Sequence, residues 1–175
     1  PTGPARPPLG VDLADRRDAD LHIPRDRPDI RHALVFRTGK LTAPLEVDGL
    51  FRAHLETVTN KYDVDVEVNF YEEKPDGRYL DLASYLGRAC YIEDRTRRHL
   101  LQPGRTRVLS FQSETLTARL LGVGRRIVAV VGVPQNPYSP INYGTGRDVT
   151  SASIGDARAA LRRQRETLDR AIADL

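Results

Sequence analysis

Two aspartates are the first residues of this sequence whose type and spacing suggest chemistry. Asp63 and Asp65 lie two positions apart in a segment of alternating residues, and in an extended strand such a pair shares one face. Paired carboxylates on a strand face can bind a cation or a basic partner. Alternatively, they belong to the solvated face of an amphipathic strand, which is the commoner arrangement. The apolar face of that strand would consist of Val64, Val66, Val68 and Phe70.

A proline-rich loop carries the other candidate binding residues. Residues 134–143 read PQNPYSPINY, and a loop that combines amides with phenols can meet a polar ligand. The alternative is a rigid loop that covers the end of a β-sandwich. The chain has no Trp, which argues against a carbohydrate ligand. The candidate residues in this loop are Asn136, Tyr138, Asn142 and Tyr143.

The usual catalytic signatures are absent from the sequence. No serine has the flanking glycines of a Gly-x-Ser-x-Gly nucleophile elbow. The single Cys90 excludes an internal disulfide and a cysteine-based zinc site. Residues 122–124 (GVG) lack the third glycine of a dinucleotide loop, and a strand follows them where a helix should begin. The histidines are too scattered for a metal site: His22, His32, His54 and His99. We therefore expect no catalytic residue, no metal and no cofactor in this chain.

Short alternating segments, separated by turn signals, predict an all-β domain. Residues 75–78 (PDGR) have the composition of a tight turn, so residues 64–82 predict a β-hairpin. Strands in this number without a long helix between them favour an antiparallel jelly-roll β-sandwich. The predicted strands are 33–36, 50–59, 64–71, 79–82, 88–92, 107–113 and 127–133.

The two ends of the chain depart from this pattern. Residues 1–31 hold six of the 12 prolines and predict an extended arm. Residues 156–175 lack Gly and Pro and predict an amphipathic helix capped by Asp156, which either packs on its own domain or docks onto a partner. The apolar stripe of this helix is Leu161, Leu168, Ile172 and Leu175. The predicted organisation is an arm at 1–31, a sandwich at 32–150 and a helix at 151–175.

Composition argues against two classes of partner. The 27 Lys and Arg residues nearly balance the 24 Asp and Glu residues, and the two signs interleave, so a nucleic-acid partner is not indicated. No apolar stretch approaches the roughly 18 residues of a membrane span, and the first residues do not read as a signal peptide. We expect a soluble, cytoplasmic protein without a membrane partner.

Six short motifs, taken in order, resemble one protein family. They are 41–49 (LTAPLEVDG), 61–65 (KYDVD), 74–78 (KPDGR), 102–104 (QPG), 121–127 (LGVGRRI) and 142–146 (NYGTG). This order is similar to the C-terminal domain of X-Pro dipeptidyl-peptidases and their cocaine esterase-like relatives, a family that also includes α-amino acid ester hydrolases and glutaryl acylases. The resemblance covers roughly residues 30–150 and implies a jelly roll of galactose-binding-like shape.

The same resemblance implies a function. Members of the family are serine hydrolases in which an α/β-hydrolase domain supplies the triad and the jelly-roll domain closes over its side. The triad maps to nothing in this chain, and the helix at 156–175 stands where the family usually has a final strand. The expected function is a non-catalytic domain or subunit of a serine hydrolase acting on esters or amides, supporting the active-site entrance. Its expected partner is an α/β-hydrolase catalytic domain or another copy of itself; the alternative is a free-standing binding module for a peptide, sugar or protein.

Overall fold

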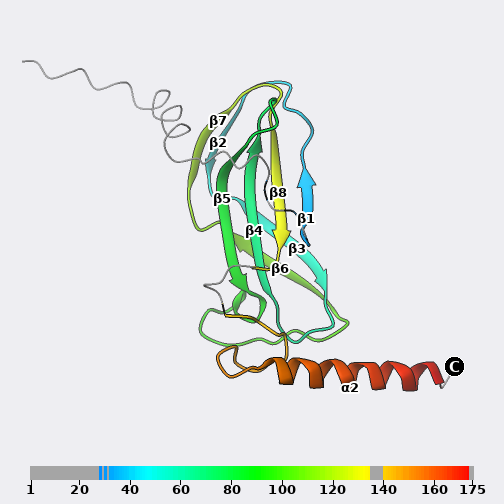
Figure 1. The fold of residues 1–175 in the computed structure, drawn as a ribbon. Coiled ribbons are helices and arrows are strands. Elements are labelled where there is room, and N and C mark those ends of the chain that lie inside the picture. The colour runs from blue at the N-terminus through cyan, green and yellow to red at the C-terminus, as the bar shows by residue number, and fades with distance from the viewer. Residues whose placement is uncertain (1–27, 29, 31, 135–139, 174–175) are drawn as a thin grey trace, which may run out of the picture. The chain divides into compact units, whose positions relative to one another are not determined.

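The computed structural model describes residues 28, 30, 32–134 and 140–173. Within these residues the chain forms strands followed by one long helix at its C-terminal end (Figure 1). The predicted all-β class with a C-terminal helix is confirmed. In chain order the elements are β1 (Leu34–Arg37), β2 (Leu45–Gly49), β3 (Arg52–Val58), β4 (Asp65–Glu73), β5 (Tyr79–Arg88), a 3₁₀ turn (Ala89–Tyr91), β6 (Thr106–Gln112), β7 (Thr117–Leu121), β8 (Arg126–Gly132) and α2 (Ile154–Ala173).

The strands form one sheet in the order β1-β8-β4-β5 and two pairs, β2-β7 and β3-β6. The chain divides into two compact units, and β4 and β5 contribute residues to both. Among the described residues, unit 1 comprises 28, 30, 32–51, 68–84 and 113–132, and unit 2 comprises 52–67, 85–112, 133–134 and 140–173. The jelly-roll connectivity and the division into arm, sandwich and helix stay predictions.

The core of unit 1 forms where antiparallel strands bring apolar side chains onto one face. Strand β1 pairs with β8 so that Arg37 lies opposite Val128, and β2 pairs with β7. Val128 and Val130 are buried together with Tyr71 of β4. The rings of Phe51 and Phe70 stack with their centroids 4.4 Å apart.

A buried charged cluster also lies in unit 1. Glu72 of β4 has no exposed surface, and its carboxylate accepts a hydrogen bond of 2.6 Å from Arg119 Nε. The guanidinium of Arg125 donates to the other carboxylate oxygen. Burial of a carboxylate is tolerated when cations pair with it in this way.

The hairpin predicted at residues 64–82 is confirmed. The amide of Lys74 donates to the carbonyl of Arg78, and the amide of Gly77 donates back to Lys74. Gly77 has a φ of 82°, in the left-handed region that favours glycine. The Asp76 side chain accepts from the amide of Arg78 and holds the turn.

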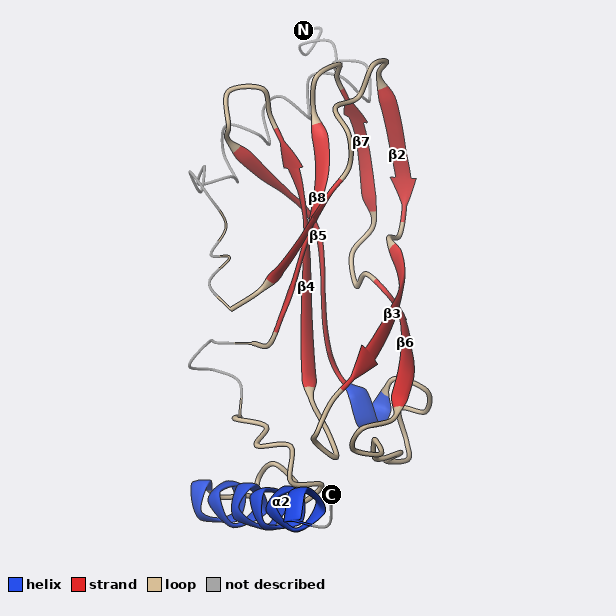
Figure 2. Cartoon of the chain, turned by 90° about the vertical axis from the view of Figure 1, so that its right-hand side faces the viewer, coloured by secondary structure: helices blue, strands red, loops and turns tan. Residues whose placement is uncertain are grey.

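Unit 2 is built around the antiparallel pair β3 and β6, which lie side by side in Figure 2. Burial along β3 alternates, with Ala53, Leu55 and Thr57 turned inward as the sequence predicts. Leu55 lies opposite Leu109, which is almost completely buried. The rings of Tyr85 and Phe111 stack with their centroids 4.1 Å apart.

Three strand assignments differ from the sequence prediction. Residues 88–92 were expected to form a strand, but β5 ends at Arg88 and a 3₁₀ turn follows. The cause is tertiary, because the amide of Cys90 donates to the Asp63 side chain. Strands β2 (LEVDG) and β7 (TARLL) were not predicted, because both are only five residues long and β2 contains no buried residue.

Burial along β4 and β8 corrects two expectations. Asp63 and Asp65 were expected on a solvated face, but both are buried. The sequence also predicts that Val66 and Ile127 point inward in neighbouring strands. Val66 is buried as predicted, whereas the buried positions of β8 are Val128 and Val130 and Ile127 is half-buried. The solvated-face interpretation of the aspartates and the predicted inward position of Ile127 are therefore wrong.

The C-terminal helix begins earlier than the predicted Asp156 cap. The Ser153 hydroxyl accepts from the amide of Asp156, whose carboxylate in turn accepts from the amide and hydroxyl of Ser153. This reciprocal pattern is a capping box with Ser153 at the N-cap. The described part of the apolar stripe is exposed, at 49% for Leu161, 59% for Leu168 and 58% for Ile172; Leu175 lies outside the described residues. No helix among the described residues is long and apolar enough to cross a membrane.

Candidate functional site

The structure brings three of the predicted site residues together in unit 2. Asp65 is the first residue of β4, Asp63 lies two residues before it, and Asn142 comes from the segment after β8. The Asn142 side-chain amide donates to Asp63 Oδ2 at 3.1 Å and to Asp65 Oδ1 at 2.7 Å. The Asn142 amide thus connects the segment after β8 to a residue that lies 77 positions earlier in the chain.

The loop that carries Asn142 is fixed by its own backbone. Asn142 Oδ1 accepts from the amide of Gly144, and the Gly144 carbonyl accepts from the amide of Tyr62. Gly144 has a φ of 69°, and a Cβ there would lie 2.8 Å from the Asp63 carbonyl oxygen and from Lys61 Cβ. Only glycine fits this position. The sequence NYGTG therefore encodes a close approach between the loop and the residues that precede β4.

A guanidinium completes the carboxylate cluster. Arg88, at the end of β5, donates from Nε and Nη2 to the two oxygens of Asp65 at 2.8 and 3.1 Å. Its Nε lies 3.8 Å from Asp63 Oδ2. The hydrogen bonds with Asp65 raise the pKa of Arg88 above its ordinary value, despite an opposing effect of burial.

Cys90 and Arg98 extend the cluster toward the loop. The Cys90 amide donates to Asp63 Oδ1 at 3.0 Å, and the Cys90 side chain is completely buried. Burial raises the pKa of the Cys90 thiol, which disfavours the reactive thiolate. Arg98 donates to the backbone carbonyls of Gly146 and Arg147 at 3.1 Å each. The interaction of Arg98 with the Cys90 side chain raises the pKa of Arg98.

This arrangement holds the loop against the residues around β4. Each carboxylate oxygen of Asp63 and Asp65 accepts at least one hydrogen bond from the protein. A cation at this site would have to displace Arg88 or Asn142. Over residues 28, 30, 32–134 and 140–173, no group of three or more His, Cys, Asp or Glu residues is placed to hold a metal ion.

The predicted site residues differ in where they lie. Asp63, Asp65 and Asn142 form the cluster, and Tyr143 follows Asn142 in the chain and is half-buried. Asn136 and Tyr138 lie outside the described residues. Sequence reasoning missed Arg88, Cys90 and Arg98. No local signal identifies these three, because each meets its partner through the fold and not through sequence spacing.

Sequence comparison finds similarity between this chain and part of a larger known protein. The chain matches no protein-family model. It is 27% identical over 161 residues to a cocaine esterase from Rhodococcus sp. (strain MB1 Bresler), an alignment that covers 90% of this chain and 27% of that protein. The chain therefore spans about a quarter of the length of the curated relative it matches.

Solved structures share the fold. An α-amino acid ester hydrolase superposes with a TM-score of 0.69 and 24% identity, covering 86% of this chain and 26% of that one. An aminopeptidase from the marine sediment archaeon Thaumarchaeota archaeon gives a TM-score of 0.66 and 24% identity, and the superposition covers 72% of this chain and 22% of that one. A CocE/NonD family hydrolase from Staphylococcus aureus gives a TM-score of 0.53 and 14% identity, and the superposition covers 62% of this chain and 24% of that one. The predicted resemblance to the C-terminal domain of cocaine esterase-like hydrolases is confirmed.

Proposed function

We propose that this chain is a non-catalytic domain of a larger hydrolase that acts on esters or amides. The observation that carries the proposal is the similarity of 90% of this chain to only 27% of a cocaine esterase. The absence of a Gly-x-Ser-x-Gly motif supports the same conclusion, because a serine hydrolase must find its nucleophile elsewhere. An α/β-hydrolase domain is the proposed partner.

Within that hydrolase, the loop after β8 is the part we assign to the active-site entrance. The predicted residues Asn136, Tyr138 and Tyr143 belong to this loop. Asn142 ties the described end of this loop, residues 140–146, to Asp63 and Asp65, so that this part of the loop is held in place before binding. A half-buried Tyr143 beside such an anchor offers a phenol and an aromatic face to a substrate or to the catalytic domain.

The test uses the complete reading frame of the gene. Replacement of Tyr143 by Ala should raise the KM for an ester substrate severalfold while kcat and the melting temperature stay close to those of the parent protein. The matched control is Phe36→Ala, which removes an exposed aromatic ring from β1 in unit 1. If both variants behave like the parent, the entrance role of this loop is refuted.

A free-standing binding module remains the second candidate, favoured by the rigid anchoring of the loop around Asn142. The reading frame separates the two functions. An upstream Gly-x-Ser-x-Gly motif in the same frame supports the hydrolase domain. A frame that encodes no further domain supports the binding module, and the Tyr143→Ala variant should then weaken ligand binding.

A further inference from the structure

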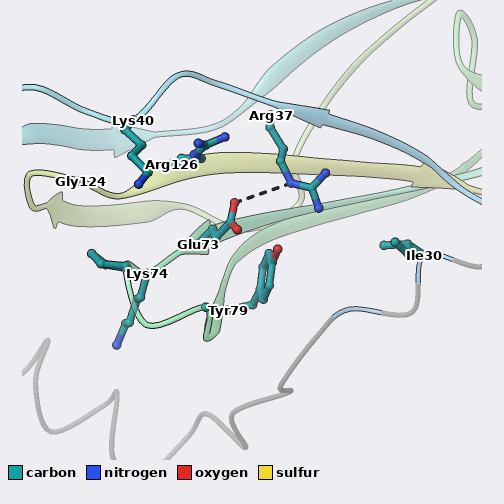
Figure 3. A pocket seen from close by; sticks show the side chains of 10 residues that line it. Ile30, Arg37, Lys40, Glu73, Lys74, Tyr79, Gly124 and Arg126 are labelled. Atoms are coloured by element: carbon teal, nitrogen blue, oxygen red, sulfur yellow. Dashed lines mark ion pairs between the residues drawn. The ribbon is translucent and has the colours of Figure 1, made fainter.

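A pocket of about 430 Å³ lies in unit 1, separate from the loop cluster described above. Its walls come from β1, the segment that follows it, the β4–β5 hairpin and the start of β8 (Figure 3). A volume of this size falls within the roughly 300–1,000 Å³ typical of small-molecule sites. The lining residues are Ile30, Arg37, Lys40, Glu73, Lys74, Pro75, Gly77, Tyr79, Gly124 and Arg126.

The charges of the pocket follow from the strand register. Val35, Val128 and Val130 form the apolar core face with Tyr71. Side chains two residues apart on a strand share a face. Moving two positions along each strand replaces Val35 by Arg37, Val128 by Arg126 and Tyr71 by Glu73. The pocket therefore lies where the apolar face of the sheet gives way to charged residues.

The pocket carries a net positive charge. Four lining residues are cationic (Arg37, Lys40, Lys74 and Arg126) and one is anionic (Glu73), which gives +4 − 1 = +3. Arg37 Nε lies 3.7 Å from Glu73 Oε2. Figure 3 shows the Tyr79 hydroxyl pointing toward the Arg37 guanidinium, and this interaction is the main reason that the pKa of Arg37 is raised.

Two of the cations have no ion-pair partner among the described residues. In the part of the chain that the structure describes, neither Lys40 nor Arg126 makes a side-chain hydrogen bond or an ion pair. Glu73 Oε2 is buried without a hydrogen bond there as well. Unpaired cations attract an oxyanion. A buried acceptor without a hydrogen bond destabilises the folded state, and a ligand that donates a hydrogen bond to it removes that cost. A ligand that suits these side chains thus needs both a negative group and a proton that it can donate.

We propose that this pocket binds a phosphate group, either as inorganic phosphate or as the monoester of a small molecule. Phosphate oxygens meet the cationic side chains of Lys40 and Arg126, and a protonated phosphate oxygen donates to Glu73 Oε2. Sulfate has the same shape and carries no proton near neutral pH, so it cannot satisfy Glu73. Discrimination between these two anions is the signature of the site.

The direct test is isothermal titration calorimetry on the 175-residue chain at neutral pH and constant ionic strength. Inorganic phosphate should bind about tenfold more tightly than sulfate, because sulfate leaves a buried acceptor unsatisfied. Glycerol phosphate is the third probe. Tighter binding of glycerol phosphate supports a phosphorylated small molecule as ligand, and equal binding supports free phosphate. Equal affinity for phosphate and sulfate, or no heat with any anion, overturns the proposal.

Variants locate the binding to the pocket. Lys40→Gln and Arg126→Gln should each weaken phosphate binding about tenfold, since each removes one charge-assisted contact. Glu73→Gln should abolish the preference for phosphate over sulfate, because the amide can donate to either anion. Lys40 is exposed, so its replacement does not endanger folding.

The matched control is Arg95→Gln, which makes the same change of net charge at an exposed position outside the pocket. It should leave the phosphate affinity unchanged. An equal loss in Arg95→Gln and Arg126→Gln would reveal general electrostatic attraction and would refute the site. Melting curves confirm that each variant is folded before its affinity is compared.

Discussion

At the scale of single residues, two valines of unit 1 provide a matched test of the core. Val128 of β8 is fully buried, whereas Val123, in the turn before the same strand, is 58% exposed. Val128→Ala should cost about 2 kcal/mol of unfolding free energy through lost burial and a residual cavity. Val123→Ala should change it by less than about 0.5 kcal/mol. Urea denaturation of both variants measures the difference, and equal effects would show that the register of β8 is misassigned.

Strands β4 and β8 show which side-chain orientations can be predicted from the sequence and which cannot. Alternation along β4 correctly predicts that Val66 points inward, because its apolar residues are separated by polar ones. The run Ile127–Val131 is apolar throughout, so its periodicity cannot distinguish one face from the other. Burial of Asp65 was equally unpredictable, since its partners Arg88 and Asn142 lie 23 and 77 residues away.

Replacement of Asn142 tests the carboxylate cluster. Asn142→Ala leaves Asp63 and Asp65 without their amide donor and should cost roughly 1–3 kcal/mol of unfolding free energy. Asn142→Asp should cost more at neutral pH, because it places a third carboxylate beside the other two. Denaturant unfolding of both variants measures the order. The control is Asn69→Ala, which removes no hydrogen bond among the described residues; an equal cost for all three would refute the role of the cluster.

At the scale of elements, the capping box makes the start of α2 sensitive to acid. Hydrogen bonds from the Ser153 side chain and backbone lower the pKa of Asp156 below its ordinary value of 3.8. A lowered pKa in the folded state means that the stabilisation is fully present above pH 3.8 and disappears as the pH falls through the lower value. Far-UV circular dichroism should record a loss of helix only below that pH.

The matching variant for this cap is Ser153→Ala. Its helix signal should already be reduced at neutral pH, and its acid transition should move toward the ordinary pKa of an aspartate. An unchanged transition would mean that Ser153 does not control Asp156. The sequence predicted this helix from its apolar spacing, but its first turn depends on the reciprocal hydrogen bonds between Ser153 and Asp156, which apolar spacing does not report.

Two leucines test whether the stripe of α2 supports the fold. Leu168 is 59% exposed, whereas Leu109 of β6 is 2% exposed. Leu109→Ala should cost about 2–5 kcal/mol, and Leu168→Ala should lie within about 0.5 kcal/mol of the parent chain. Thermal or urea unfolding compares them. A large cost at Leu168 would favour packing of the helix on its own domain, as one of the two sequence interpretations holds.

Removal of α2 tests whether the helix docks onto a partner or a second copy of the chain. In a chain shortened after Gly155, the melting temperature should stay close to that of the parent, because the stripe is exposed. Light scattering then tests docking, since loss of a dimer or a partner complex on shortening would show that the stripe forms an interface. If the particle measured by light scattering loses only the mass of the removed helix, the stripe does not form an interface.

At the scale of the whole molecule, the isolated chain should not hydrolyse esters or peptides. It covers about a quarter of the cocaine esterase it resembles, and its sequence lacks the nucleophile elbow. A chromogenic acyl ester measures this directly. Turnover that survives purification and disappears on mutation of a residue of this chain would contradict the prediction and the proposed function together.

The buried Glu72 has a consequence for how the chain is made. Its two guanidinium partners lie 47 and 53 residues further along the sequence. During synthesis on the ribosome, β4 and β5 emerge before Arg119 and Arg125 exist, and a carboxylate cannot leave water without them. Unit 1 must therefore wait for its last strands before it closes, and a nascent chain arrested before Arg119 should keep β4 open to proteases.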